Sequence, residues 1–116
     1  MRLATFEPGQ KTIKRAIIWL SGLTCTEENF ITKAGIQRIL ADTDTMVLAP
    51  DTSPRGLSLP GEHDAYDFGS GAGFYVDAVT PHYDLHYRMF SYVVEDICQI
   101  AQAHFGVSDL SLMGHS

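Results

Sequence analysis

The feature that most constrains the fold is a set of three short, mainly apolar runs at residues 16–20, 45–49 and 110–113. Such short runs are typical of strands buried on both faces of a parallel sheet. Between them, apolar residues recur with helical spacing over residues 29–42 and 90–105. Strands that alternate with helices predict a parallel sheet with right-handed crossovers. We therefore expect an α/β fold.

The ends of the two predicted helices carry recognisable signals. Either Thr26 with Asn29 or Thr24 with Glu27 is placed to cap the first helix. Gly106 suits the stop after the second helix. One face of that helix is interpreted as core, with the stripe Met89, Phe90, Val93 and Ile97.

The composition limits the classes of partner. The chain has 116 residues, 8 Lys and Arg against 14 Asp and Glu, a net charge of −6 and 45% hydrophobic residues. The acidic balance argues against nucleic-acid and anionic-membrane partners, and no apolar run is long enough to span a membrane. No secretory signal is visible, and two cysteines make no disulfide framework, so a reducing, cytoplasmic location is expected.

The predicted elements are too few to cover both faces of a parallel sheet. Three strands and two helices leave bare sheet edges that other strands normally pair. We therefore expect residues 1–116 to form a single, incomplete domain that lacks its first strands and its C-terminal part, and to fold poorly alone.

Residues 50–80 are rich in proline and glycine, and so long an irregular stretch is usually functional. Its glycines at 69, 71 and 73 are interpreted as letting the loop pack closely beside an active site. Asp51 is interpreted as a loop organiser. Arg55 and Arg88 are each assigned either to a substrate carboxylate or to an ion pair with a loop aspartate. His82 and His86 have a possible zinc spacing but no third ligand, so no metal or cofactor is expected.

The last three residues, Gly114-His115-Ser116, follow a predicted strand. They match the first half of the Gly-x-Ser-x-Gly turn that carries a nucleophilic serine, in which a small residue precedes the serine by two. The first strand runs into Ser21-Gly22-Leu23, where the Leu23 amide is placed to serve as one donor of an oxyanion hole. Ser116 is thus the candidate nucleophile.

Longer strings carry a family resemblance. Residues 19–35 (WLSGLTCTEENFITKAG), 49–56 (APDTSPRG), 67–78 (DFGSGAGFYVDA) and 87–93 (YRMFSYV) resemble S-formylglutathione hydrolases, the esterase D family. The resemblance implies an α/β-hydrolase fold and a cytosolic serine thioesterase that converts S-formylglutathione to formate and glutathione, in formaldehyde detoxification. It assigns the nucleophile to Ser116, an oxyanion donor to Leu23 and a place near the active site to Cys25. It also implies a small thioester or ester substrate, no cofactor, and homodimers among full-length members.

The family places its triad Asp and His after the serine, so both are missing from residues 1–116. A terminal carboxylate on Ser116 would also repel the developing oxyanion, and we expect the isolated chain to be inactive. Tyr66 stands where the family usually has tryptophan, and residues 79–86 diverge. Three interpretations stay open: a truncated S-formylglutathione hydrolase, a carboxylesterase or acyltransferase of the same fold, and a non-catalytic remnant.

Overall fold

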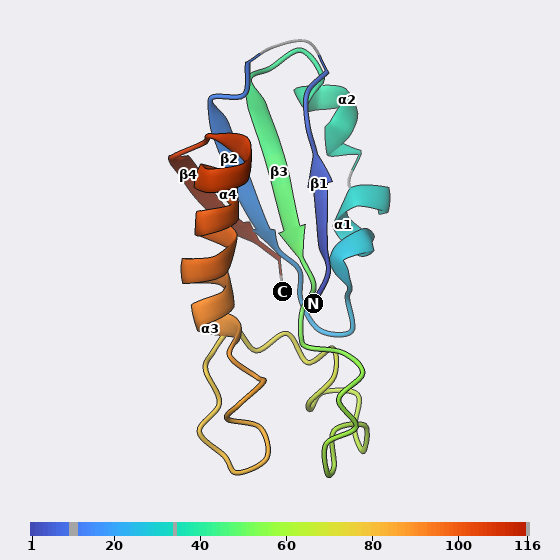
Figure 1. The fold of residues 1–116 in the computed structure, drawn as a ribbon. Helices are drawn as coiled ribbons and strands as arrows, with labels where there is room; N and C mark the ends of the chain where they lie inside the picture. Colours follow the sequence, from blue (N-terminus) through green and yellow to red (C-terminus); the bar gives the residue numbers. More distant parts are fainter. Residues whose placement is uncertain (10–11, 34, 116) are drawn as a thin grey trace.

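A four-stranded sheet forms the centre of the computed structural model, which describes residues 1–9, 12–33 and 35–115. Helices lie on both sides of the sheet, and long loops extend from one of its ends (Figure 1). The elements in chain order are β1 (Leu3–Phe6), β2 (Arg15–Leu20), α1 (Glu27–Lys33), α2 (Ile36–Leu40), β3 (Thr45–Pro50), α3 (Met89–Ser91), the π-helical segment η1 (Tyr92–Ile97), α4 (Cys98–Phe105) and β4 (Asp109–Gly114).

The sheet is mixed, with the strand order β1-β3-β2-β4. β2 pairs in parallel with both β3 and β4, which confirms the three predicted strands. β1 runs antiparallel to β3 at the sheet edge, so the sheet contains one antiparallel strand that the sequence pattern did not predict. The four residues of β1 are half-buried or exposed, and such a short edge strand lacks the apolar run by which the buried strands were recognised.

The first predicted helix, over residues 29–42, is divided in two. Gly35 lies between α1 and α2 with a φ of 65°, a left-handed conformation that ends a right-handed helix. The cap of α1 is the pair Thr26 and Asn29. The Thr26 amide donates to Asn29 Oδ1 (2.7 Å), and the Glu28 amide donates to Thr26 Oγ1 (3.4 Å).

The second predicted helix is confirmed, since α3, η1 and α4 follow one another from residue 89 to residue 105. It ends at Gly106, where the Val107 amide bonds the Ala101 carbonyl and the Gly106 amide bonds the Gln102 carbonyl. This is the paired C-terminal pattern expected for glycine at that position. Phe90 is 56% exposed and does not belong to the core, although the rest of its predicted stripe is buried.

The helices bury the two faces of the sheet in separate cores. The α3–α4 side buries Ala16, Ile18, Met46, Leu48, Val93, Ile97, Ala101 and Val107. The α1–α2 side buries Phe30, Val47 and Ala49. On β4, in contrast, Leu112 is 61% exposed and Met113 is 47% exposed. Within the described ranges, none of the helices has the length and apolar character needed to cross a membrane.

Candidate active site

The carboxyl ends of β2 and β4 lie side by side, which brings two candidate site segments to one edge of the sheet. Leu20 is paired with Gly114, and the His115 amide donates to the Leu20 carbonyl (3.2 Å). A Cβ on Gly114 would lie 3.3 Å from that carbonyl oxygen, so a larger residue fits only if the Leu20 backbone shifts by a few tenths of an ångström. Ser116, the expected nucleophile, lies outside the described residues.

A tight turn follows β2 and holds Leu23. The Cys25 amide donates to the Gly22 carbonyl (3.2 Å), which places Leu23 and Thr24 at the two central positions. Thr24 has a φ of 64°, a conformation in which a β-branched residue is an outlier. The Leu23 amide has no acceptor among the described residues. The turn therefore contains one backbone donor that no described residue satisfies.

The loop over residues 69–75 braces this turn. The Thr24 amide donates to the Gly71 carbonyl (2.7 Å), and the Tyr75 hydroxyl donates to the Ser21 carbonyl. A Cβ on Gly73 would lie 3.2 Å from the Gly22 carbonyl carbon, so the close packing inferred for this glycine is confirmed. Burial, aided by the nearby Cys25 and Asp51, raises the pKa of Tyr75 to about 12, and its hydroxyl therefore remains a donor at neutral pH.

Arg55 and Arg88 both form ion pairs with aspartates of their own loops. Arg55 Nη2 lies 2.8 Å from Asp51 Oδ1, and Arg88 Nη2 lies 3.4 Å from Asp77 Oδ2. The Asp51 side chain is 2% exposed, and its carboxylate also accepts the Thr52 amide (2.7 Å). Hydrogen bonding to Asp51 raises the pKa of Arg55. The interpretations of Asp51 as a loop organiser and of both arginines as ion-pair partners are confirmed.

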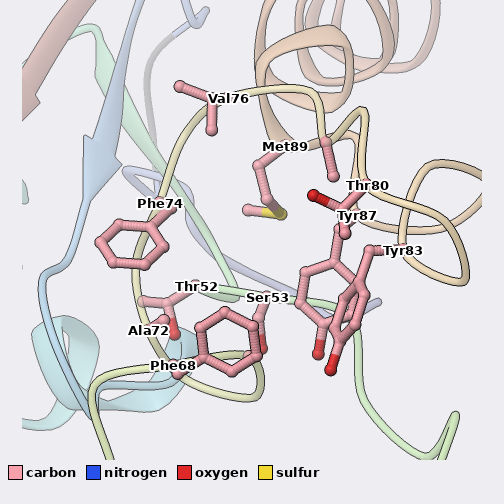
Figure 2. A pocket seen from close by; sticks show the side chains of 12 residues that line it. Thr52, Ser53, Phe68, Ala72, Phe74, Val76, Thr80, Tyr83, Tyr87 and Met89 are labelled. Carbon is pink, nitrogen blue, oxygen red and sulfur yellow. The ribbon is translucent and has the colours of Figure 1, made fainter. Parts of the chain in front are cut away.

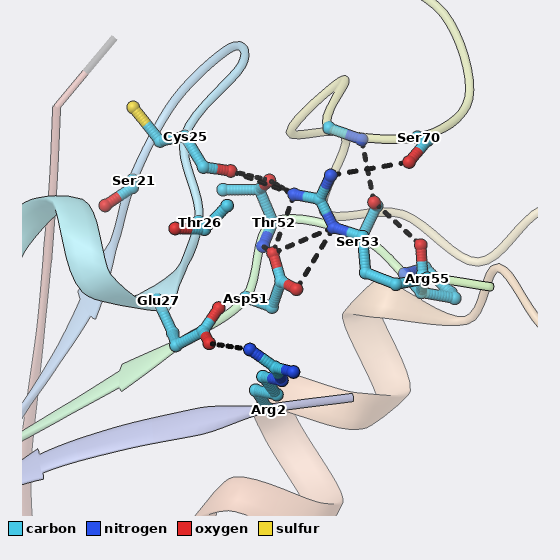
Figure 3. A network of polar contacts seen from close by, with 12 residues as sticks. Arg2, Ser21, Cys25, Thr26, Glu27, Asp51, Thr52, Ser53, Arg55 and Ser70 are labelled. Atoms are coloured by element: carbon cyan, nitrogen blue, oxygen red, sulfur yellow. Dashed lines mark hydrogen bonds and ion pairs between the residues drawn. The ribbon is translucent and has the colours of Figure 1, made fainter. Parts of the chain in front are cut away.

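Cys25 contributes its backbone to the network around Arg55 (Figure 3). Its carbonyl accepts hydrogen bonds from Thr52 Oγ1 and Arg55 Nη2, whereas its sulfur points away from the guanidinium. The thiol is half-buried and free. A depression connects the turn to the end of β4 and is lined by Trp19, Ser21, Gly22, Cys25, Asn29, Phe30 and His115.

A second, largely apolar pocket of about 120 Å³ lies among the loops (Figure 2). Its lining includes Thr52, Ser53, Phe68, Ala72, Phe74, Val76, Tyr83, Tyr87 and Met89. The Tyr83 hydroxyl donates to the Pro60 carbonyl, and the Tyr87 hydroxyl donates to the buried Glu62 carboxylate. This pocket is not predictable from the apolar pattern of the sequence, because most of its wall residues lie in irregular segments. The concentration of aromatic residues between 66 and 90 was the available signal.

The two histidines with zinc spacing lie in the loop between residues 80 and 87 and not on a helix. In the part of the chain that the structure describes, no group of three His, Cys, Asp or Glu side chains could hold a metal ion.

Comparisons with known proteins place this chain in a family. Residues 7–116 match the model of the Esterase family, described as "Putative esterase". The chain is 48% identical to S-formylglutathione hydrolase of Mus musculus and 47% identical to that of Rattus norvegicus. Each match covers 100% of this chain and 43% of the relative. The chain thus spans less than half the length of these relatives.

A solved structure shows the same fold. The S-formylglutathione hydrolase from Agrobacterium tumefaciens superposes with a TM-score of 0.90 at 37% sequence identity, over 98% of this chain and 43% of that one. The expected α/β-hydrolase architecture is therefore confirmed for these residues, and it includes the antiparallel strand β1, which was not predicted from the sequence. From the family match and this superposition we conclude that the chain belongs to the Esterase family and has the fold of S-formylglutathione hydrolases.

Proposed function

We propose that this chain supplies the nucleophile and one oxyanion donor of a cytoplasmic serine hydrolase acting on S-formylglutathione. The observation that carries the proposal is the parallel pairing of β2 with β4, in which Leu20 lies beside Gly114. Position 116 follows Gly114 by two residues in the sequence, and Leu23 offers its amide at the same edge of the sheet. The names of the relatives support the choice of substrate.

In this mechanism the Ser116 hydroxyl loses its proton to a histidine and attacks the formyl carbon of the thioester. The Leu23 amide and the amide of the residue after the serine stabilise the resulting oxyanion. The glutathione thiolate leaves, and water then hydrolyses the formyl-enzyme to formate. The histidine and its orienting aspartate are expected in residues that follow the serine in chain order.

A second candidate is a carboxylesterase that accepts a small apolar acyl or alcohol group. The apolar pocket favours it, because Ala72 and Phe74 line this pocket while the intervening Gly73 touches the turn of Leu23. A site walled by carbon atoms discriminates substrates by size and apolar contact.

The test joins residues 1–116 to the part of the mouse relative that this chain does not cover. We expect this fusion to hydrolyse S-formylglutathione faster than p-nitrophenyl acetate, and residues 1–116 alone to be inactive. The variant Ser116→Ala should lower kcat by at least about 10⁴-fold. Turnover that survives this substitution would contradict the proposal, and a preference for the acetate would favour the carboxylesterase. A folded but inactive fusion would indicate a non-catalytic remnant.

A further inference from the structure

Strain is concentrated in the turn that carries Leu23. Thr24 occupies the third position of this turn with a φ of 64°, where glycine or asparagine is the usual residue. A threonine left to itself would return to negative φ, because its branched Cβ clashes in the left-handed region. Such strain persists only where the surrounding structure holds it.

Hydrogen bonds hold the chain on both sides of Thr24. Its own amide donates to the Gly71 carbonyl at 2.7 Å. The carbonyl of the following residue, Cys25, accepts hydrogen bonds from Thr52 Oγ1 and from Arg55 Nη2, the latter at 3.1 Å. The turn therefore cannot relax at Thr24 without breaking contacts to the segments that follow β3.

Arg55 is the centre of these contacts (Figure 3). Its Nε and Nη2 atoms bind both oxygens of the buried Asp51 carboxylate, at 3.1 Å and 2.8 Å. Its Nη1 atom lies 3.4 Å from Ser70 Oγ. Only the planar fork of an arginine reaches a carboxylate, a carbonyl and a hydroxyl in this way. One side chain thus ties the end of β3 to the turn and to the glycine-rich loop.

The glycine-rich loop is fixed by the same segment. The Gly71 amide donates to Ser53 Oγ at 2.7 Å in a buried bond. The Gly71 carbonyl is the acceptor for Thr24. Residues 51–55 therefore hold the turn directly, through Cys25, and indirectly, through Gly71.

We infer that Arg55, anchored by Asp51, is a positioning residue that holds the strained Gly22–Cys25 turn in the conformation that exposes the Leu23 amide. The inference rests on the proposed function for what that amide does, since a preorganised donor is what oxyanion stabilisation requires. The contacts by which Arg55 and Asp51 hold the turn are independent of that function, because all of them join residues that the structure describes.

The test is amide hydrogen exchange followed by NMR on the fusion of residues 1–116 with the remainder of the mouse relative, and it requires no catalysis. Arg55→Lys keeps the positive charge but loses the fork. We expect the Thr24 amide to exchange at least about tenfold faster, as for the loss of a charge-assisted hydrogen bond, and the Leu23 signal to shift. Arg88→Lys is the matched control, because it weakens the ion pair with Asp77 and should leave Thr24 unchanged.

Thr24→Gly provides a rescue that a general stabilising role would not predict. Glycine adopts positive φ without strain. The amide at position 24 should therefore exchange equally slowly in the double variant Thr24→Gly/Arg55→Lys and in the single variant Thr24→Gly. Three results would overturn the inference: unchanged Thr24 exchange in Arg55→Lys, lost protection throughout β2 and β3, or no rescue by glycine. None of these results depends on turnover, whereas the proposed function is judged by the turnover of the fusion protein and of its Ser116→Ala variant.

Discussion

At the scale of single residues, the site depends on how closely two backbones approach. Gly73 has a φ of 75°, and a Cβ there would lie 3.4 Å from the Leu23 nitrogen as well as 3.2 Å from the Gly22 carbonyl carbon. Both neighbours are backbone atoms of a hydrogen-bonded turn, so they have little freedom to move. The space beside Gly73 therefore sets where the Leu23 amide lies.

Gly73→Ala should consequently destabilise the chain more than the same substitution at a glycine where the added Cβ would contact no other atom. Gly56 is the matched control, because it has a φ of 76° and a Cβ there would meet no described atom within 4 Å. We expect Gly56→Ala to cost about 1–2 kcal/mol from backbone strain alone, and Gly73→Ala to cost roughly 1–3 kcal/mol more through overpacking. Urea unfolding measures both, and equal losses would contradict the role of the close approach.

The role of a single residue was predictable from the sequence where that role depends on the type of its side chain, or on the lack of one. The need for a small residue at 114 and the organising role of Asp51 followed from residue type and position, whereas the ion pairs of Arg55 and Arg88 were one of two alternatives that the sequence left open. The left-handed conformation of Thr24 did not, because no local pattern indicates a β-branched residue at positive φ. It depends on Arg55 and Gly71, which lie far along the chain and meet the turn only in the folded state.

At the scale of elements, the long helical segment begins on a carboxylate from the loop before it. Asp77 Oδ1 accepts the Ser91 amide at 3.0 Å, and Asp77 Oδ2 accepts the Ser91 hydroxyl. These bonds to Ser91, aided by Arg88, lower the pKa of Asp77 below its ordinary value of 3.8. The loop and the start of the helix are therefore coupled through one ionised group.

This coupling predicts a specific acid dependence. A carboxyl whose pKa is lower in the folded state contributes stability above its unfolded pKa, and that contribution is lost as the pH falls through the folded value. Asp77→Asn should therefore be less stable than the wild type at pH 7, with a difference that shrinks below about pH 4. Asp96→Asn, which removes an exposed charge from the same helical segment, should show no such trend. Urea unfolding between pH 2.5 and 7 makes the comparison.

Elements were predictable in proportion to their local signal. The strands β2, β3 and β4 and the helical segment from 89 to 105 carry strong apolar patterns, although β4 is largely exposed in the structure, contrary to the burial expected from its sequence. The break at Gly35 was missed because apolar spacing continues across it, with Ile36 and Leu40 packing on the same core as Phe30. β1 was missed because its partner β3 lies about forty residues away in the sequence. Its own four residues are too few to show a strand pattern.

At the scale of the whole molecule, apolar surface is distributed unevenly. Leu112 lies beside Ile18 in the sheet, yet Leu112 is 61% exposed and Ile18 is fully buried. The helical segment packs over β2 and β3 and leaves this part of β4 uncovered, and Val94 on that segment is 50% exposed. An apolar strand at an open sheet edge favours association between molecules.

We therefore expect residues 1–116 in isolation to associate as their concentration rises. Leu112→Lys should raise the apparent dissociation constant of self-association by about tenfold or more, since a charge on an edge strand opposes pairing. Ile39→Lys is the control, because Ile39 is 74% exposed on α2, away from β4. Sedimentation velocity over a range of concentrations measures the effect. A monomeric wild type, or an equal effect of both variants, would contradict it.

The bracing of the Leu23 turn also has a consequence for the order of assembly. The contacts described for that turn come from the turn itself and from residues 52–75, all of which precede the serine at 116. On a ribosome, the turn that we propose as the oxyanion donor and the residues that brace it are therefore synthesised before the proposed nucleophile. Under the proposed function, activity would then depend on translation of the serine and of the histidine that accepts its proton. It would not require a change in the conformation of the Gly22–Cys25 turn.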